Sequence, residues 1–216
     1  MKKITNLIII DASSSMQSKT QAVKDGLKDL FKTIKQASID NPEIKTRTIV
    51  TQFSYPEHFK VLVDTKGVDK LTNKIADSYV ASGNTALFDA IGASFELVGK
   101  KQDGVFVNIL TDGQENSSIE LNTEAVKKLF AKANEKKWGL TFMATTQEAI
   151  ESIVSMGVSR SNTMSFMDNN NGVFQASMSR GASMNTYYSN VTKSTSKDDL
   201  DNENLIVQKK EEKKEG

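Results

Sequence analysis

The segment that decides the fold is Ile-Thr-Asn-Leu-Ile-Ile-Ile-Asp-Ala-Ser-Ser-Ser-Met, residues 4–16. Its first part, residues 4–10, is rich in β-branched apolar side chains, which is typical of a strand buried on both faces. The run ends at Asp11, and Ser13 and Ser15 follow at alternate positions. Alternate residues of an extended segment point the same way, so one carboxylate and two hydroxyls are predicted to converge where the strand ends.

Outward from this segment, strand-like and helix-like stretches alternate. Apolar residues at helical spacing, from Val23 to Ile34, predict a helix over residues 18–36 with Ser18 as its N-cap. The other predicted strands are residues 47–53, 59–63, 105–110, 140–144 and 163–167, and the other predicted helices are residues 68–77, 86–98, 123–136, 147–156 and 172–188. This alternation indicates an α/β fold: a doubly wound, mostly parallel six-stranded sheet, Rossmann-like, with helices on both faces. Such sheets bind ligands at the carboxyl ends of their strands.

Two further loops carry polar residues at such boundaries. Ser82-Gly83-Asn84-Thr85 precedes the helix at 86–98, and Thr111-Asp112-Gly113 follows the strand at 105–110. With the first loop they offer two carboxylates and three hydroxyls, those of Asp11, Asp112, Ser13, Ser15 and Thr85. Oxygen donors of this kind suit a hard divalent cation, Mg²⁺ or Mn²⁺, with a position left for a carboxylate from another molecule. Taken singly, Thr85 is equally explained as a helix cap, and Asp112-Gly113 as a turn.

The three motifs together resemble the von Willebrand factor A-type (VWA) domain with its metal-ion-dependent adhesion site. The matching residues are Asp11-x-Ser13-x-Ser15, then Gly83-Asn84-Thr85-Ala86-Leu87, then Leu110-Thr111-Asp112-Gly113, and the resemblance spans about residues 4 to 190. It implies metal ligation by Ser13, Ser15 and Thr85, with Asp11 and Asp112 binding directly or through water. The segments 144–150 and 162–166 are similar to the last strands of intracellular microbial members, which suggests a microbial or phage-like protein. Such members often work with AAA-type ATPases, so a protein partner of that kind is an expectation from the resemblance.

Composition narrows the function classes. The chain has 28 Lys and Arg against 27 Asp and Glu, so it lacks the basic excess that nucleic-acid binding needs. It has 0 Cys and 1 His, which excludes thiolate chemistry and imidazole-rich zinc sites. No apolar run approaches the roughly 18 residues of a membrane span, so we expect a cytoplasmic protein without a membrane partner.

The two ends of the chain differ in character. Residues 1–192 are predicted to form the VWA-type domain, and residues 193–216, rich in Lys, Asp, Glu and Ser, a disordered charged tail. Its one apolar island, Leu205-Ile206-Val207, is either a docking peptide for a partner or a chance triplet in a solvated tail, and the second interpretation is favoured. Asp89 is interpreted as a structural residue in the first turn of a helix.

Three functions compete. The leading hypothesis is a non-enzymatic module that grips an acidic residue of a partner protein through Mg²⁺ or Mn²⁺. The second is a metal-dependent hydrolase acting on phosphate esters, although Ser13 stands where phosphatases of the haloacid dehalogenase type have a second aspartate. The third is a structural subunit whose metal only stabilises its loops.

Overall fold

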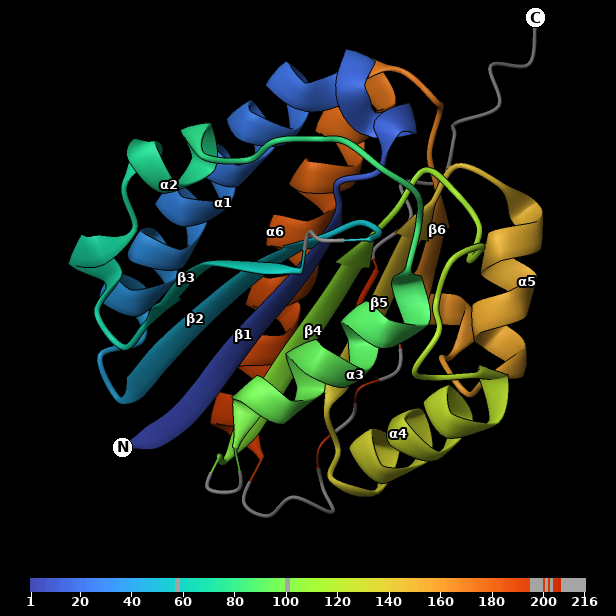
Figure 1. Ribbon diagram of the computed structural model, residues 1–216. Helices are drawn as coiled ribbons and strands as arrows, with labels where there is room; N and C mark the ends of the chain where they lie inside the picture. Colours follow the sequence, from blue (N-terminus) through green and yellow to red (C-terminus); the bar gives the residue numbers. More distant parts are fainter. Residues whose placement is uncertain (57–58, 100–101, 195–199, 201, 203, 207–216) are drawn as a thin grey trace, which may run out of the picture.

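The computed structural model describes residues 1–56, 59–99, 102–194, 200, 202 and 204–206. Its centre is a six-stranded sheet in the order β3-β2-β1-β4-β5-β6. All neighbouring strands are parallel except β2 and β3, which are antiparallel. The predicted doubly wound, mostly parallel sheet is therefore confirmed, with the 4–11 segment at its middle (Figure 1).

The strands are β1 (Lys2–Asp11), β2 (Ile44–Phe53), β3 (Lys60–Thr65), β4 (Gly104–Leu110), β5 (Gly139–Ala144) and β6 (Thr163–Ser165). The α-helices are α1 (Thr20–Asp40), α2 (Asn73–Asp77), α3 (Leu87–Val98), α4 (Thr123–Glu135), α5 (Gln147–Ser155) and α6 (Asn170–Lys193). Short 3-10 turns cover Ser14–Lys19, Val68–Lys70 and Arg160–Asn162.

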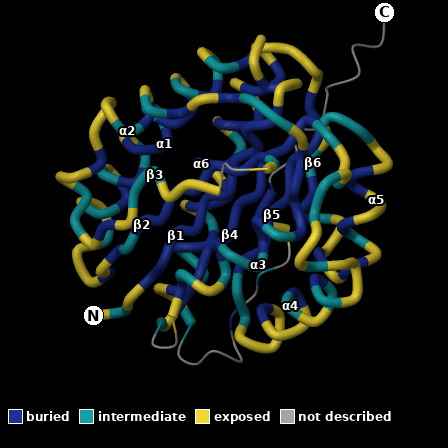
Figure 2. Tube along the Cα trace, in the orientation of Figure 1, coloured by how far each residue is buried: buried dark blue, intermediate teal, exposed yellow. Residues whose placement is uncertain are grey.

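Helices cover both faces of the sheet and divide the core into two layers. The helices α1, α2 and α6 pack on one face, where Ile4, Ile8 and Ile10 of β1 point. The helices α3, α4 and α5 pack on the other, where Leu7 and Ile9 point. The strands β1, β2, β4 and β5 form the buried centre, while the edge strand β3 is mostly exposed or half-buried (Figure 2). Continuous apolar runs in β1 and β4 are thus explained by burial on two faces.

Several boundaries differ from the sequence predictions. The single helix predicted over residues 68–77 is two short pieces, because Leu71 and Thr72 between them are extended and Leu71 is buried in the core. Ser18 does not cap α1; it lies within the 3-10 turn that precedes the helix. The helix α6 runs from Asn170 to Lys193, beyond the predicted 172–188 at both ends.

The described part of the segment after α6 is packed against the domain. Leu200, Leu205 and Ile206 are buried, so the expectation of a solvated tail is wrong for these residues, while residues 195–199, 201, 203 and 207–216 lie outside the described part. The Asn162 side chain holds the segment: its Oδ1 accepts from Leu205 N at 2.7 Å and its Nδ2 donates to the Asn202 carbonyl at 2.7 Å. Two hydrogen bonds of the Asn162 side-chain amide therefore hold the segment that carries Leu205 and Ile206. The composition of this segment did not indicate that the two residues are buried.

Across the described helices, none combines the length and the apolar character needed to cross a membrane.

Candidate metal centre

The three polar loops meet at the carboxyl edge of the sheet, and backbone hydrogen bonds join them. Ser82 N donates to the Ala12 carbonyl at 2.6 Å, and Ser14 N donates to the Gly83 carbonyl at 2.8 Å. Thr111 N donates to the Met143 carbonyl of the neighbouring strand at 3.0 Å. The loop geometry is thus set by the main chain before any side chain is considered.

Gly83 is required where the second loop passes the segment that follows β2. Its φ is +82°, and a Cβ atom there would lie 2.3 Å from the Tyr55 carbonyl oxygen. Tyr55 and Asn84 exchange two backbone hydrogen bonds at this crossing, of 3.0 and 3.1 Å. Only glycine combines this positive φ with so close an approach.

Four of the five predicted ligands form one hydrogen-bonded chain. Asp11 Oδ1 accepts from Ser13 N at 2.7 Å, the hydroxyls of Ser13 and Ser15 lie 3.0 Å apart, and Ser15 Oγ donates to Asp112 Oδ1 at 2.6 Å. The fifth, Thr85, lies beside them: a Cβ added at Gly113 would be 3.4 Å from Thr85 Oγ1. The structure therefore brings all five residues together, and their role as metal ligands stays a prediction.

Asp11 lies fully buried at the base of this chain. Burial raises its pKa to about 6, against the opposing effect of hydrogen bonds from Thr111 and Ser13, and the nearby Asp112 charge raises it further. Thr111 Oγ1 donates to Asp11 Oδ2 at 2.5 Å, and the Tyr79 hydroxyl donates to the Asp11 carbonyl oxygen at 2.7 Å. Thr111 and Tyr79 were not singled out from the sequence, since a threonine at a strand end and a distant tyrosine carry no signal of this contact.

Lys19 is a third residue that was not predicted from the sequence as part of the site. Only 4% of it is exposed, and its Nζ lies 2.8 Å from Asp112 Oδ2 and 2.5 Å from Asp168 Oδ1. Desolvation lowers its pKa, but the two carboxylates outweigh this and the net direction is upward. Lys19 is therefore an ammonium at neutral pH, inside a site that was predicted from oxygen donors alone.

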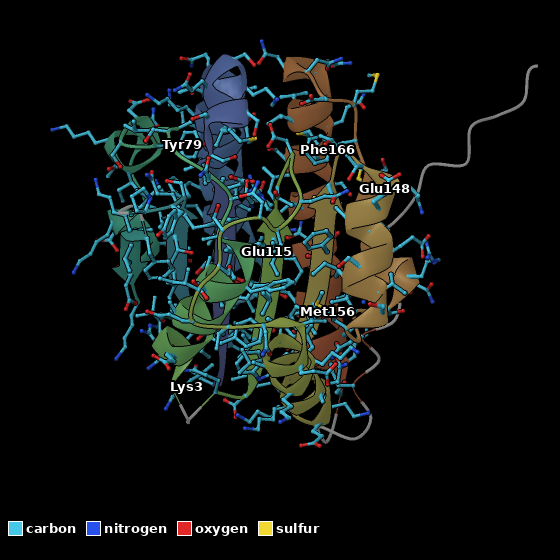
Figure 3. All side chains as sticks on the ribbon, turned by 45° about the vertical axis from the view of Figure 1, so that its right-hand side comes forward. Lys3, Tyr79, Glu115, Glu148, Met156 and Phe166 are labelled. Atoms are coloured by element: carbon cyan, nitrogen blue, oxygen red, sulfur yellow. The ribbon has the colours of Figure 1, made fainter. Side chains whose placement is uncertain are left out.

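Acidic side chains organise the loop that follows Asp112. Glu115, labelled in Figure 3, accepts hydrogen bonds from Ser117 N, Ser118 N and Phe88 N. With Ser118 Oγ it caps the N-terminus of α3, so Thr85 does not act as the cap: its side chain makes no capping bond. Asp89 accepts from three successive backbone N–H groups, of residues 119–121, at 2.7–3.0 Å. Asp89 is thus a structural residue, as interpreted from the sequence, but its main contacts are with the loop at residues 119–121.

The donor set fits a hard cation. Within the described residues no three Asp, Glu, His or Cys side chains gather as a ligand cluster, so the site has only its two carboxylates, supplemented by hydroxyls. The hydrogen bonds between Ser13, Ser15 and Asp112 join groups whose oxygen lone pairs can turn to a cation. Mg²⁺ tolerates few carboxylates and keeps several waters, which matches this sparse set.

Comparison with known proteins agrees with this geometry. The family model for the von Willebrand factor type A domain matches residues 7–180. A search of the curated proteins finds no match.

Solved structures share the fold at low sequence identity. The vWF domain of the type V pili tip protein Mfa5 from Porphyromonas gingivalis has a TM-score of 0.66 at 8% identity, over 86% of this chain and 96% of that one. A von Willebrand factor type A protein from Catenulispora acidiphila has a TM-score of 0.61 at 14% identity, over 85% and 43%. Proximal thread matrix protein 1 from the mussel byssus, with a zinc-occupied MIDAS motif, has a TM-score of 0.54 at 14% identity. The chain covers 45% of that mussel protein, and 83% of the chain is aligned.

Proposed function

Because the chain belongs to the von Willebrand factor type A domain family, we propose that it is a protein-binding module that depends on a divalent metal. Asp11, Ser13, Ser15, Thr85 and Asp112 would hold Mg²⁺ or Mn²⁺, and an acidic residue of a partner protein would complete the coordination. The observation that carries the proposal is the convergence of these side chains at one edge of the sheet. A zinc-occupied site in the mussel protein of the same fold supports it.

The kind of ligand at the site favours an incoming carboxylate. The carboxylates of Asp11, Asp112 and Asp168 face the Lys19 ammonium, so a bound divalent cation would bring the net charge of the cluster to about 0. A cation held mainly by neutral hydroxyls and water keeps its attraction for a further anion. A glutamate or aspartate of a partner supplies that anion with a short, flexible side chain.

The position of Asp11 supports a non-enzymatic role. Both of its oxygens accept hydrogen bonds, from Ser13 N and Thr111 Oγ1, and it has no exposed surface. A carboxylate held in this way is poorly placed to attack a phosphate ester. The hydrolase alternative is tested by assaying a panel of phosphate esters with Mg²⁺, where turnover abolished by Asp11→Asn would contradict the proposal.

Calorimetric titration of Mg²⁺ and Mn²⁺ into chelator-treated protein tests the site. The Ser13→Ala, Ser15→Ala double variant is expected to lose saturable binding. Ser159 and Ser161 offer a matched control, because their hydroxyls also lie two residues apart and 2.9 Å from each other, at the start of the 3-10 turn Arg160–Asn162 and away from the site. Binding that survives in the site variant, or is lost in the control, would contradict the assignment.

Capture of proteins from the source cell tests the partner. We expect a set of proteins that is retained with Mg²⁺, released by EDTA and absent with the double variant. Equal capture under all three conditions would refute the adhesion mechanism and leave the structural-subunit alternative. The cytoplasmic location and an AAA-type ATPase as partner remain predictions.

A further inference from the structure

A buried ammonium shares a carboxylate with the candidate metal centre. Lys19 ends the 3-10 turn Ser14–Lys19, which begins inside the Asp11-x-Ser13-x-Ser15 motif and returns the Lys19 side chain to the site. Its Nζ contacts Asp112 Oδ2 at 2.8 Å, while Ser15 occupies the other oxygen of the same carboxylate. Both carboxylate oxygens of Asp112 are therefore contacted by side chains of this chain, Oδ2 by Lys19 and Oδ1 by Ser15.

The two partners of Lys19 differ in environment. The Asp112 side chain is 1% exposed and the Asp168 side chain is 63% exposed. The Lys19 side chain lies between them and is 6% exposed. A buried charge is costly when it loses its partner, so an unpaired Lys19 would strongly disfavour any state in which Asp112 is engaged elsewhere. Lysine carries three donors on one nitrogen and can keep Asp168 when it gives up Asp112.

A divalent cation and this ammonium compete for one carboxylate. Both draw their stabilisation from Asp112, and two like charges placed against it repel each other in a poorly hydrated environment. Asp168 stands at the rim, where it can neutralise Lys19 without occupying any of the five predicted ligands. The pair Lys19–Asp168 thus provides a place for the displaced positive charge.

We propose that Lys19 is a built-in competitor cation that holds Asp112 in the metal-free protein, and that Asp168 is the carboxylate that retains Lys19 when a metal ion takes Asp112. The inference rests on the proposed function, since it presupposes a metal at this site. Lys19 and Asp168 are positioning residues that act through Asp112. They affect the affinity for the metal, because metal binding replaces the Lys19–Asp112 ion pair and leaves Lys19 paired with Asp168 alone.

Titration of Mg²⁺ and Mn²⁺ into four proteins tests the inference through changes of opposite sign. Lys19→Met keeps the length and apolar stem of the side chain but removes the competitor, so affinity is expected to rise about tenfold. Asp168→Asn leaves Lys19 dependent on Asp112, so affinity is expected to fall several-fold. The double variant should match Lys19→Met, because Asp168 acts only through Lys19.

A matched control separates this effect from a general change of charge. Lys28 lies in α1 and pairs with Asp77 at 2.8 Å and with Asp25 at 3.6 Å, so Lys28→Met also removes one positive charge and two ion pairs, and it is expected to leave affinity unchanged. Thermal unfolding gives a second readout. Lys19→Met is expected to be less stable than the parent in EDTA, because Asp112 loses its counter-ion, and to gain more from Mg²⁺.

The outcomes distinguish the inference from the proposed function. If the parent binds metal but Lys19→Met binds with equal or lower affinity, the competitor role is wrong and the metal site stands. If both single variants change affinity in the same direction, the exchange with Asp168 is refuted. If no form, including Lys19→Met, binds Mg²⁺ or Mn²⁺, the proposed function fails and the inference with it.

Discussion

The stability of the metal-free protein should depend on pH through Asp11. Burial raises the pKa of this carboxyl from 3.8 to about 6, so the folded chain binds the proton more tightly than the unfolded chain. Stability from this group is fully present below pH 3.8 and is lost as the pH rises through about 6. A shift of roughly two pH units corresponds to about 3 kcal/mol at 1.36 kcal/mol per unit.

Urea unfolding in EDTA at several pH values between 4 and 7, for the parent and for Asp11→Asn, isolates this contribution. Asparagine keeps the shape of the side chain but does not ionise, and subtracting its curve removes the effect of other groups, such as Asp64, whose pKa is lowered by Arg47. The difference in unfolding free energy should fall by about 2 kcal/mol between pH 4 and pH 7, since part of the full shift lies below pH 4. Saturating Mg²⁺ should flatten it, since a cation favours the ionised carboxylate. A difference that stays constant across this range in EDTA would refute the reasoning.

Two further predictions concern packing. Leu205→Ala should cost about 3 kcal/mol and lower the melting temperature by roughly 6–12 °C in calorimetry, because the side chain is fully buried; Ile119→Ala, at a 75% exposed position, is the control, and equal melting temperatures would contradict the packed segment. Gly83→Ala should destabilise the domain by about 2 kcal/mol or more and weaken metal binding, because its Cβ would meet the Tyr55 carbonyl. Gly99→Ala, also at positive φ but with no atom within 4 Å, should cost less in chemical denaturation, and an equal cost would show that the clash is relieved.

The sheet could be predicted because its signals are local. Runs such as residues 4–10 and 105–110 are apolar at all but two and one positions respectively, a pattern typical of burial on two faces. The carboxyl ends of parallel strands then lie at one edge by geometry alone. Asp11 and Asp112 follow two strands that are neighbours in the sheet, so their proximity followed from the topology.

Other parts of the site depend on contacts that leave no trace in a single sequence. Lys19 stands in a polar stretch that looks like an exposed helix start, and its burial results from the 3-10 turn. Asp168 lies 149 residues away from it. The cap of α3 comes from Glu115 and Ser118 in another loop, where a local rule favoured Thr85. Leu205 and Ile206 are too short an apolar run to outweigh their charged surroundings, and their burial depends on Asn162.

The central place of β1 has a consequence for folding kinetics. The first strand made is the one that pairs on one side with β2 and on the other with β4, which begins about a hundred residues later. Asn6 can form its hydrogen bond with Tyr188 only later still, because the two residues lie 182 positions apart in the sequence. Non-local pairings of this kind slow folding, because the chain loses the entropy of closing a long loop before the stabilising contacts form. Until β4 has been synthesised, one side of β1 is an unprotected edge, and its four consecutive apolar residues, 7–10, are where we expect chaperones to bind and aggregation to start.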